Sequence, residues 1–219
     1  MAYVKICGLN DPTHIRVAAE AGADWVGFVL FEKSPRNVLS PGSDRLEDLE
    51  ILVRTAEELG IASVVLMVDP DEALFMETLE RIRPVALQLH GRETQTDVHR
   101  MWLDCAGQAE LWKAFPVSEP ADLEALEGWS LDRLLVDAAP PQNATRPGGN
   151  GVTADWHSVQ GHAFPQPWIL AGGLTPQNVI EAVQQTDAPA VDVSSGVERA
   201  TGLKDEDLIR AFIDAAKSV

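Results

Sequence analysis

A thiol and a carboxylate stand where two apolar segments of the sequence end. Cys7 closes the run 3–7, and Asp137 closes the run 133–137. A lone cysteine of this kind is more often a small buried hydrophobic residue, and a lone aspartate is more often a helix cap or a loop anchor. Lys5, however, precedes the cysteine closely enough to hold a thiolate. Because proton transfer at two points of one substrate needs an acid and a base set apart, these residues predict a general acid–base site.

Two turns of small residues follow the last two apolar runs. Gly172 and Gly173 follow one run, and Ser194, Ser195 and Gly196 follow the other. Such turns expose backbone N–H groups, and several N–H groups can converge on an anion. Either turn alone is more often only a tight turn. In barrels of alternating strands and helices, however, these two loops are the usual phosphate grip, so we expect a phosphate site.

A third candidate is Arg36, which follows Ser34 and Pro35. A rigid proline turn that presents a guanidinium suits bidentate recognition of a carboxylate. A solvated surface arginine is the equally good alternative on these residues alone.

These residues need elements to position them, and the sequence predicts eight parallel strands. The runs are rich in Val, Ile and Leu and do not alternate with polar residues, as expected for strands covered on both faces. They lie at 3–7, 25–31, 62–68, 86–89, 110–115, 133–137, 168–171 and 190–193. Right-handed crossovers permit a closed (βα)8 barrel or an open doubly wound sheet. Eight units of about 27 residues favour a single-domain α/β TIM barrel over 1–219, with its active site at the C-terminal ends of the strands.

Helix signals lie between the strands. Asp11 and Pro12 read as an N-cap and a first-turn proline with Gly22 closing the helix, and Thr175-Pro176 repeats this device. Further helices are expected at 44–59, 71–82 and 205–217. Those after the fourth, fifth and sixth strands are weakly signalled, and 138–155 reads as a Pro/Gly-rich loop, which in a compact domain is usually functional or mobile.

Composition excludes several classes of function. Lys and Arg number 17 against 34 Asp and Glu, which gives a net charge of −17 and makes nucleic acid or an anionic membrane surface a poor partner. The N-terminus lacks a signal-peptide pattern, and no apolar run approaches the roughly 20 residues of a membrane span. Two distant cysteines suit a reducing compartment, so we expect a cytoplasmic protein.

Metal and nucleotide sites are not expected. His157 and His162 are five positions apart and fall on different sides of a helix. The glycine-rich stretch 148–151 lacks the Lys-Ser/Thr pair of a nucleotide-binding loop.

Taken in order, the motifs resemble the phosphoribosylanthranilate isomerase family of tryptophan biosynthesis. The resemblance runs from residue 3 to 205 and rests on KICG at 5–8, SPR at 34–36, QLHG at 88–91, LLVD at 134–137, GGNG at 148–151, LAGGL at 170–174 and DVSSGVE at 192–198. Chance is a poor explanation for KICG, QLHG and DVSSGVE in this order.

The resemblance implies a (βα)8 barrel that carries out an Amadori rearrangement without a cofactor or a metal. Asp137 is then the general acid that opens the ribose ring, and Cys7 is the general base at C2′. Cys7 must be at least partly thiolate in the complex, so its pKa is expected to be lowered there by local positive potential. Arg36 pairs with the anthranilate carboxylate. The implied phosphate and substrate contacts are Lys5, Gln88, His90, Gly149, Gly172, Gly173, Ser194, Ser195 and Gly196.

A few residues depart from the family pattern, and two other functions were weighed. Asn150, Thr201 and Asn37 differ from the residues usual in the family, and none of them changes the acid or the base. The sequence lacks a second phosphate turn after the third and fourth strands, which speaks against the related bifunctional histidine/tryptophan-pathway isomerase. The runner-up is a catalytically silent phosphosugar-binding barrel in a pathway complex. A monomer is expected, with a homodimer as the alternative.

Overall fold

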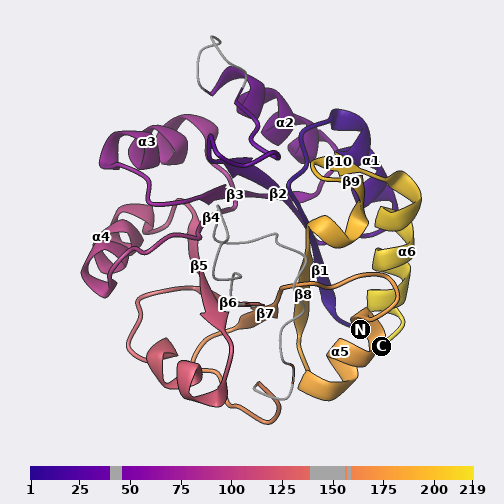
Figure 1. Ribbon diagram of the computed structural model, residues 1–219. Coiled ribbons are helices and arrows are strands. Elements are labelled where there is room, and N and C mark those ends of the chain that lie inside the picture. The colour runs from indigo at the N-terminus through magenta and orange to yellow at the C-terminus, as the bar shows by residue number, and fades with distance from the viewer. Residues whose placement is uncertain (40–45, 139–155, 157–158) are drawn as a thin grey trace.

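Eight parallel strands close into a barrel in chain order, with the helices outside it, as the computed structural model shows for residues 1–39, 46–138, 156 and 159–219 (Figure 1). The strands are β1 (Tyr3–Cys7), β2 (Trp25–Leu30), β3 (Ala62–Met67), β4 (Ala86–Leu89), β5 (Glu110–Val117), β6 (Arg133–Ala138), β7 (Trp168–Leu170) and β8 (Ala190–Val193). Lys5 of β1 pairs with Trp25 of β2 on one side and with Asp192 of β8 on the other, which closes the ring. The predicted TIM barrel is confirmed, and the predicted strand ends agree with the structure to within two residues.

Six α-helices are described around the barrel. They are α1 (Pro12–Glu20), α2 (Glu47–Glu58), α3 (Glu72–Glu77), α4 (Gln95–Cys105), α5 (Val179–Thr186) and α6 (Glu206–Lys217). A π-helical turn, Thr78–Ile82, extends α3. Two short antiparallel strands, β9 (Glu198–Ala200) and β10 (Leu203–Lys204), follow β8.

The helix predictions are confirmed in part. Asp11 caps α1 by accepting a hydrogen bond from the Thr13 amide, as its sequence predicts. The prediction for Thr175-Pro176 is wrong, because α5 begins only at Val179. The Thr175 amide donates to Asn178 Oδ1 at 2.7 Å, which makes a separate turn ahead of the helix.

The segments after β4 and β5 differ from each other, although both carried weak helix signals. After β4, α4 is a full helix that starts with a reciprocal capping box between Thr94 and Asp97. After β5 a 3-10 helix, Pro120–Leu126, is found instead of an α-helix. The 138–155 loop and Gly149 lie outside the described residues apart from Ala138, as does His157.

Strand alternation separates two apolar regions. One face of each strand packs against the helices and forms the larger core. The other face fills the barrel with mostly small or aromatic side chains, namely Val64, Ala86, Trp112, Ala114, Leu135, Ile169, Ala171 and Ala190. Trp25 meets Trp112 edge to face at 5.5 Å between ring centroids, and the Arg133 guanidinium lies 5.2 Å from both rings. The N-terminal half of the barrel is therefore plugged, and polar side chains gather toward the other end.

The C-terminal helix, α6, brings the C-terminus of the chain close to the N-terminus. Ile209, Phe212, Ile213 and Ala216 of α6 are buried at helical spacing, and α6 packs against α1, α5 and β1. Lys217 approaches the Tyr3 ring to 5.8 Å, so the termini lie close together (Figure 1). In the part of the chain that is described, no helix is long and apolar enough to cross a membrane.

Candidate active site

The Cys7 thiol is buried at the C-terminal end of β1, beside the ammonium group of Lys5. Both side chains face the space left by Gly27 on β2: a Cβ atom there would lie 2.8 Å from Cys7 Sγ and 3.1 Å from Lys5 Nζ. Lys5 is fully buried, and its Nζ donates to Asp192 Oδ1 at 3.0 Å. The thiol, the ammonium and the carboxylate thus form one buried group between β2, β1 and β8.

Burial controls the proton affinity of this group. Burial raises the pKa of Cys7, Asp192 raises it further, and the positive charges of Lys5 and Lys204 offset only part of the increase. Burial lowers the pKa of Lys5, but Asp192 and Cys7 together hold it above its ordinary value. In the free protein the pKa of Cys7 is thus raised, because the thiol is fully enclosed and shares the Lys5 charge with Asp192. The lowered pKa expected in the complex with substrate stays a prediction.

Asp137 is the penultimate residue of β6 and meets His90, which follows β4. His90 Nε2 lies 3.1 Å from Asp137 Oδ2, and both side chains are largely buried. His90 Nδ1 has no hydrogen-bond partner among the described residues. Either group can be the donor in this contact, because the imidazole has two tautomers and a carboxyl group can carry a proton, and the contact holds Asp137 in place at the barrel mouth.

Gln88 is a buried amide without a partner in the described structure. It lies two residues after Ala86 on the same strand, so both side chains are on the same face. Because Ala86 faces the barrel interior, Gln88 faces it too. Its exposure is 0%, and neither Nε2 nor Oε1 has a hydrogen-bond partner among the described residues. An unpaired buried polar group costs about 1–3 kcal/mol. The side chain is therefore poised for polar groups of a ligand.

Arg36 is not a solvated surface arginine. Its exposure is 4%, and it makes a bidentate pair with Glu198, with Nε donating to Oε1 at 2.6 Å and Nη2 to Oε2 at 2.8 Å. Gly8, with φ +78°, lets the side chain pass, because a Cβ there would lie 2.6 Å from Arg36 Cδ and 3.1 Å from Ser194 Oγ. Arg36 thus lies between the end of β1 and the loop after β8.

Glu198 and Lys204 are structural partners that reasoning from residue chemistry missed. Lys204 Nζ donates to Glu198 Oε1 at 2.8 Å and to the Ser194 carbonyl oxygen at 2.8 Å. Burial raises the pKa of Glu198, but Arg36 and Lys204 outweigh it and hold the pKa at about 2. Burial lowers the pKa of Lys204, while Glu198 opposes this. In the sequence, Glu198 is marked only as the last residue of the DVSSGVE motif, and Lys204 lies six residues beyond it.

The two predicted glycine turns lie side by side. Gly172 and Gly173 both adopt positive φ, at 91° and 64°, which favours glycine. Gly196 packs so closely against the Leu174 carbonyl that a Cβ there would overlap it. Ser195–Val197 forms a short 3-10 turn directly after β8. The loops after β7 and β8 therefore pack against each other at Gly196 and Leu174, and the phosphate site at these loops stays a prediction.

Taken together, the fold and the site define a (βα)8-barrel protein with titratable side chains buried at the C-terminal ends of its strands, as in a barrel enzyme. Residues 4–215 match the family model described as N-(5′-phosphoribosyl)anthranilate isomerase. Curated relatives of that name are 49% identical in Paramagnetospirillum magneticum, covering 98% of this chain and 96% of the relative, and 46% identical in Paracoccus denitrificans, covering 97% and 96%.

Solved structures agree. The phosphoribosylanthranilate isomerase of Thermotoga maritima has a TM-score of 0.84 at 33% identity, with both chains covered completely. An isomerase in complex with reduced 1-(o-carboxyphenylamino)-1-deoxyribulose 5-phosphate has a TM-score of 0.78 at 30% identity, again with complete coverage of both chains. The chain belongs to the N-(5′-phosphoribosyl)anthranilate isomerase family. It is an isomerase of tryptophan biosynthesis that converts an aldose to a ketose, and the silent-barrel alternative has no support.

Proposed function

We propose that Asp137 and Cys7 are the general acid and the general base of this isomerisation. The observation that carries the proposal is that both side chains end strands at the same mouth of the barrel, each with a buried partner: His90 for Asp137 and Lys5 for Cys7. The two groups belong to separate clusters, as an acid and a base acting on different atoms of one substrate require.

In the first step Asp137 gives its proton to the ribose ring oxygen. The bond from C1′ to that oxygen breaks, and the anilino nitrogen donates its lone pair to form a protonated Schiff base. The substrate thereby gains a positive charge at the nitrogen. His90, held against the carboxyl, keeps the acid oriented while its charge changes.

In the second step the Cys7 thiolate removes the proton from C2′. The electrons of that C–H bond form the C1′–C2′ double bond, and the iminium nitrogen becomes a neutral amine. The enolamine then gives its 2′-hydroxyl proton to the Asp137 carboxylate and takes up at C1′ the proton held by Cys7, which yields the ketone and restores the acid and the thiolate. Since burial raises the pKa of Cys7, the thiolate needs both Lys5 and the positive charge of the Schiff base.

Substrate binding is assigned to three groups of residues. Because Glu198 occupies Nε and Nη2 of Arg36, only the guanidinium edge that carries Nη1 remains to pair with the anthranilate carboxylate. Gln88 supplies its unpaired amide to the substrate. The phosphate is held by Gly172, Gly173, Ser194, Ser195 and Gly196. Gly149 remains a prediction from the resemblance.

The test is the loss of phosphoribosylanthranilate fluorescence with purified protein. Cys7→Ala and Asp137→Asn are expected to lower kcat at least about a thousandfold, with product binding retained. Cys105→Ala is the matched control, because burial raises the pKa of this second buried thiol to about 12 and it lies on α4, away from the mouth. Near-wild-type kcat in either Cys7→Ala or Asp137→Asn would remove that residue from the mechanism.

Assembly and location remain predictions. One solved structure holds generated monomers of a dimeric isomerase from Thermotoga maritima, so that relative is dimeric. A monomer stays the expectation here, with a homodimer as the alternative. Cytoplasmic location is supported by the two free cysteines, Cys7 and Cys105. The acidic surface charge still speaks against nucleic acid and anionic membranes as partners.

A further inference from the structure

A buried ion pair that the proposed chemistry does not use lies behind the loop after β4. Lys113 Nζ on β5 is 2.5 Å from Glu93 Oε2, and both side chains are 4% exposed. Lys113 lies between Trp112 and Ala114, which face the barrel interior, so it points outward. Its ammonium group lies 5.7 Å from the centre of the Phe115 ring. The two charges are therefore enclosed between the barrel and its outer layer.

Stability alone is a poor reason for such a pair. Removing two charges from water costs several kcal/mol per ion, and buried ion pairs can often be replaced by apolar residues without loss of stability. The role of the pair is therefore sought in the other groups to which Glu93 and Lys113 form hydrogen bonds.

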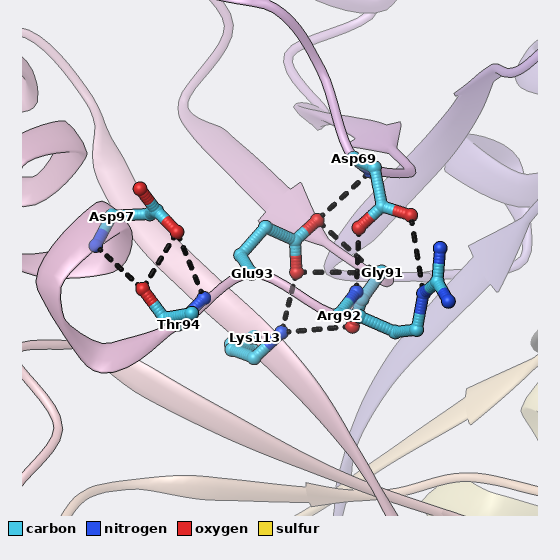
Figure 2. A network of polar contacts seen from close by, with 7 residues as sticks. All are labelled: Asp69, Gly91, Arg92, Glu93, Thr94, Asp97 and Lys113. Carbon is cyan, nitrogen blue, oxygen red and sulfur yellow. Dashed lines mark hydrogen bonds and ion pairs between the residues drawn. The ribbon is translucent and has the colours of Figure 1, made fainter.

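The pair clamps both backbone groups of Gly91. The Gly91 amide donates to Glu93 Oε1 at 3.1 Å and to Oε2 at 3.2 Å, and the Gly91 carbonyl accepts from Lys113 Nζ at 3.1 Å (Figure 2). Glu93 Oε1 also accepts from the Asp69 amide at 3.0 Å. A Cβ atom at Gly91 would lie 2.6 Å from Asp69 N and 2.6 Å from Glu93 Oε1, so only glycine fits this clamp.

The clamp fixes the residue that holds the proposed acid. The Gly91 amide belongs to the peptide that joins His90 to Gly91. The His90 amide, in the preceding peptide, donates to the Met67 carbonyl at 2.9 Å. Both peptides around His90 are thus anchored, and its imidazole meets Asp137 at 3.1 Å. We propose that Glu93 and Lys113 are positioning residues, which set the angle of His90 and through it the orientation of the Asp137 carboxyl. This inference rests on the proposed roles of Asp137 and His90.

The first test compares single variants. Glu93→Gln and Lys113→Met are expected to lower kcat about 10- to 100-fold while KM changes less than about threefold. A merely structural role would instead change the amount of folded protein and leave kcat per folded molecule unchanged. Arg92→Gln is the matched control, because this side chain is 95% exposed in the same loop and makes a long ion pair with Asp69 Oδ2 at 3.8 Å. Its kcat is expected to equal that of the wild type.

The second test is a double-mutant cycle with His90→Asn. If the pair acts through His90, adding Glu93→Gln to His90→Asn changes kcat less than about twofold. If the fold-losses in kcat of Glu93→Gln and His90→Asn multiply in the double variant, the positioning inference is wrong. Near-ultraviolet circular dichroism checks the fold. Should a single variant not fold, the cycle uses E93L/K113M, which leaves no unpaired buried charge.

Asp137→Asn separates this inference from the proposed function. Wild-type kcat in Asp137→Asn would defeat the proposed acid itself. An inactive Asp137→Asn together with multiplying losses in the cycle would defeat only the role of Glu93 and Lys113.

Discussion

His90 and Asp137 meet at 3.1 Å although the strand β5 lies between the strands that carry them. In the register of the barrel, β5 places Pro116 beside Asp137. A proline has neither a backbone N–H nor a polar side chain to offer, so the partner of the carboxyl comes from the loop after β4. The orientation of the proposed acid therefore depends on how that loop is held.

Alkylation of Cys7 in the free enzyme is expected to be slow at neutral pH. Burial raises the pKa of this thiol, so the reactive thiolate is scarce at pH 7 and its amount increases as the pH rises past the ordinary range for cysteine. Lys5→Met removes a positive charge beside the sulfur and should slow alkylation further at every pH. Mass spectrometry of iodoacetamide labelling against pH measures this, with Cys105 as an internal reference; full labelling of Cys7 at pH 6 would contradict it.

Gln88→Met is expected to gain stability and lose activity. The substitution removes a fully buried amide that has no partner among the described residues, so the free energy of unfolding should increase by about 1 kcal/mol. The same change removes a proposed substrate contact and should lower kcat/KM at least about tenfold. Urea unfolding and steady-state kinetics check the two effects. A loss of stability would show that the amide is satisfied inside the free protein.

Gly27→Ala is expected to disturb the base. Its added Cβ would press on Cys7 Sγ and Lys5 Nζ, with a cost in stability of about 1–3 kcal/mol and a clear fall in kcat. Gly107→Ala is the matched control, because no atom lies within 4 Å of its added Cβ. That variant bears only backbone strain at φ +77° and should keep its kcat. Equal kinetics for the two variants would contradict the crowding of the thiol.

Glu198 is expected to contribute stability that depends on pH. Its pKa is about 2 in the folded protein against an ordinary 4.5, so its contribution is complete above pH 4.5 and is lost as the pH falls toward 2. Glu198→Gln should cost about 3 kcal/mol at pH 7, since it leaves Arg36 and Lys204 without their carboxylate.

The difference in unfolding free energy between wild type and Glu198→Gln should therefore shrink between pH 5 and pH 3, as measured by denaturant titration at each pH. Glu58→Gln, exposed at the end of α2, is the control and should show no such dependence. A difference that stays constant over this range would contradict the low pKa of Glu198.

Much of the fold and of the candidate site follows from the sequence. Strands covered on both faces require uninterrupted apolar runs, and the eight runs are the eight strands of the barrel. Parallel strands place their C-terminal ends together, so residues that close those runs, such as Cys7 and Asp137, lie at the same mouth of the barrel. The order of the motifs was enough to indicate the family, which the relatives confirm.

Other features depend on contacts between residues far apart in the chain. The proton affinity of Cys7 is one, because a nearby lysine in the sequence says nothing of the burial that outweighs its charge. The partner of Arg36 is another, since Glu198 is 162 positions away. Local sequence signals were also a poor guide to the helices. The apolar pattern of α4 is weak, but the segment forms a full helix that begins with a capping box.

The sequence by itself determined the order of strands, the end of the barrel at which the proposed site lies, and the residue types of the proposed acid, base and phosphate turns. Only the tertiary structure decided which charge meets which, as in the clamp of Glu93 and Lys113 on Gly91 (Figure 2). The physical reason is that apolar periodicity and turn chemistry act over a few residues. Burial, pKa and ion pairing, in contrast, are set by neighbours that only the closed barrel brings together.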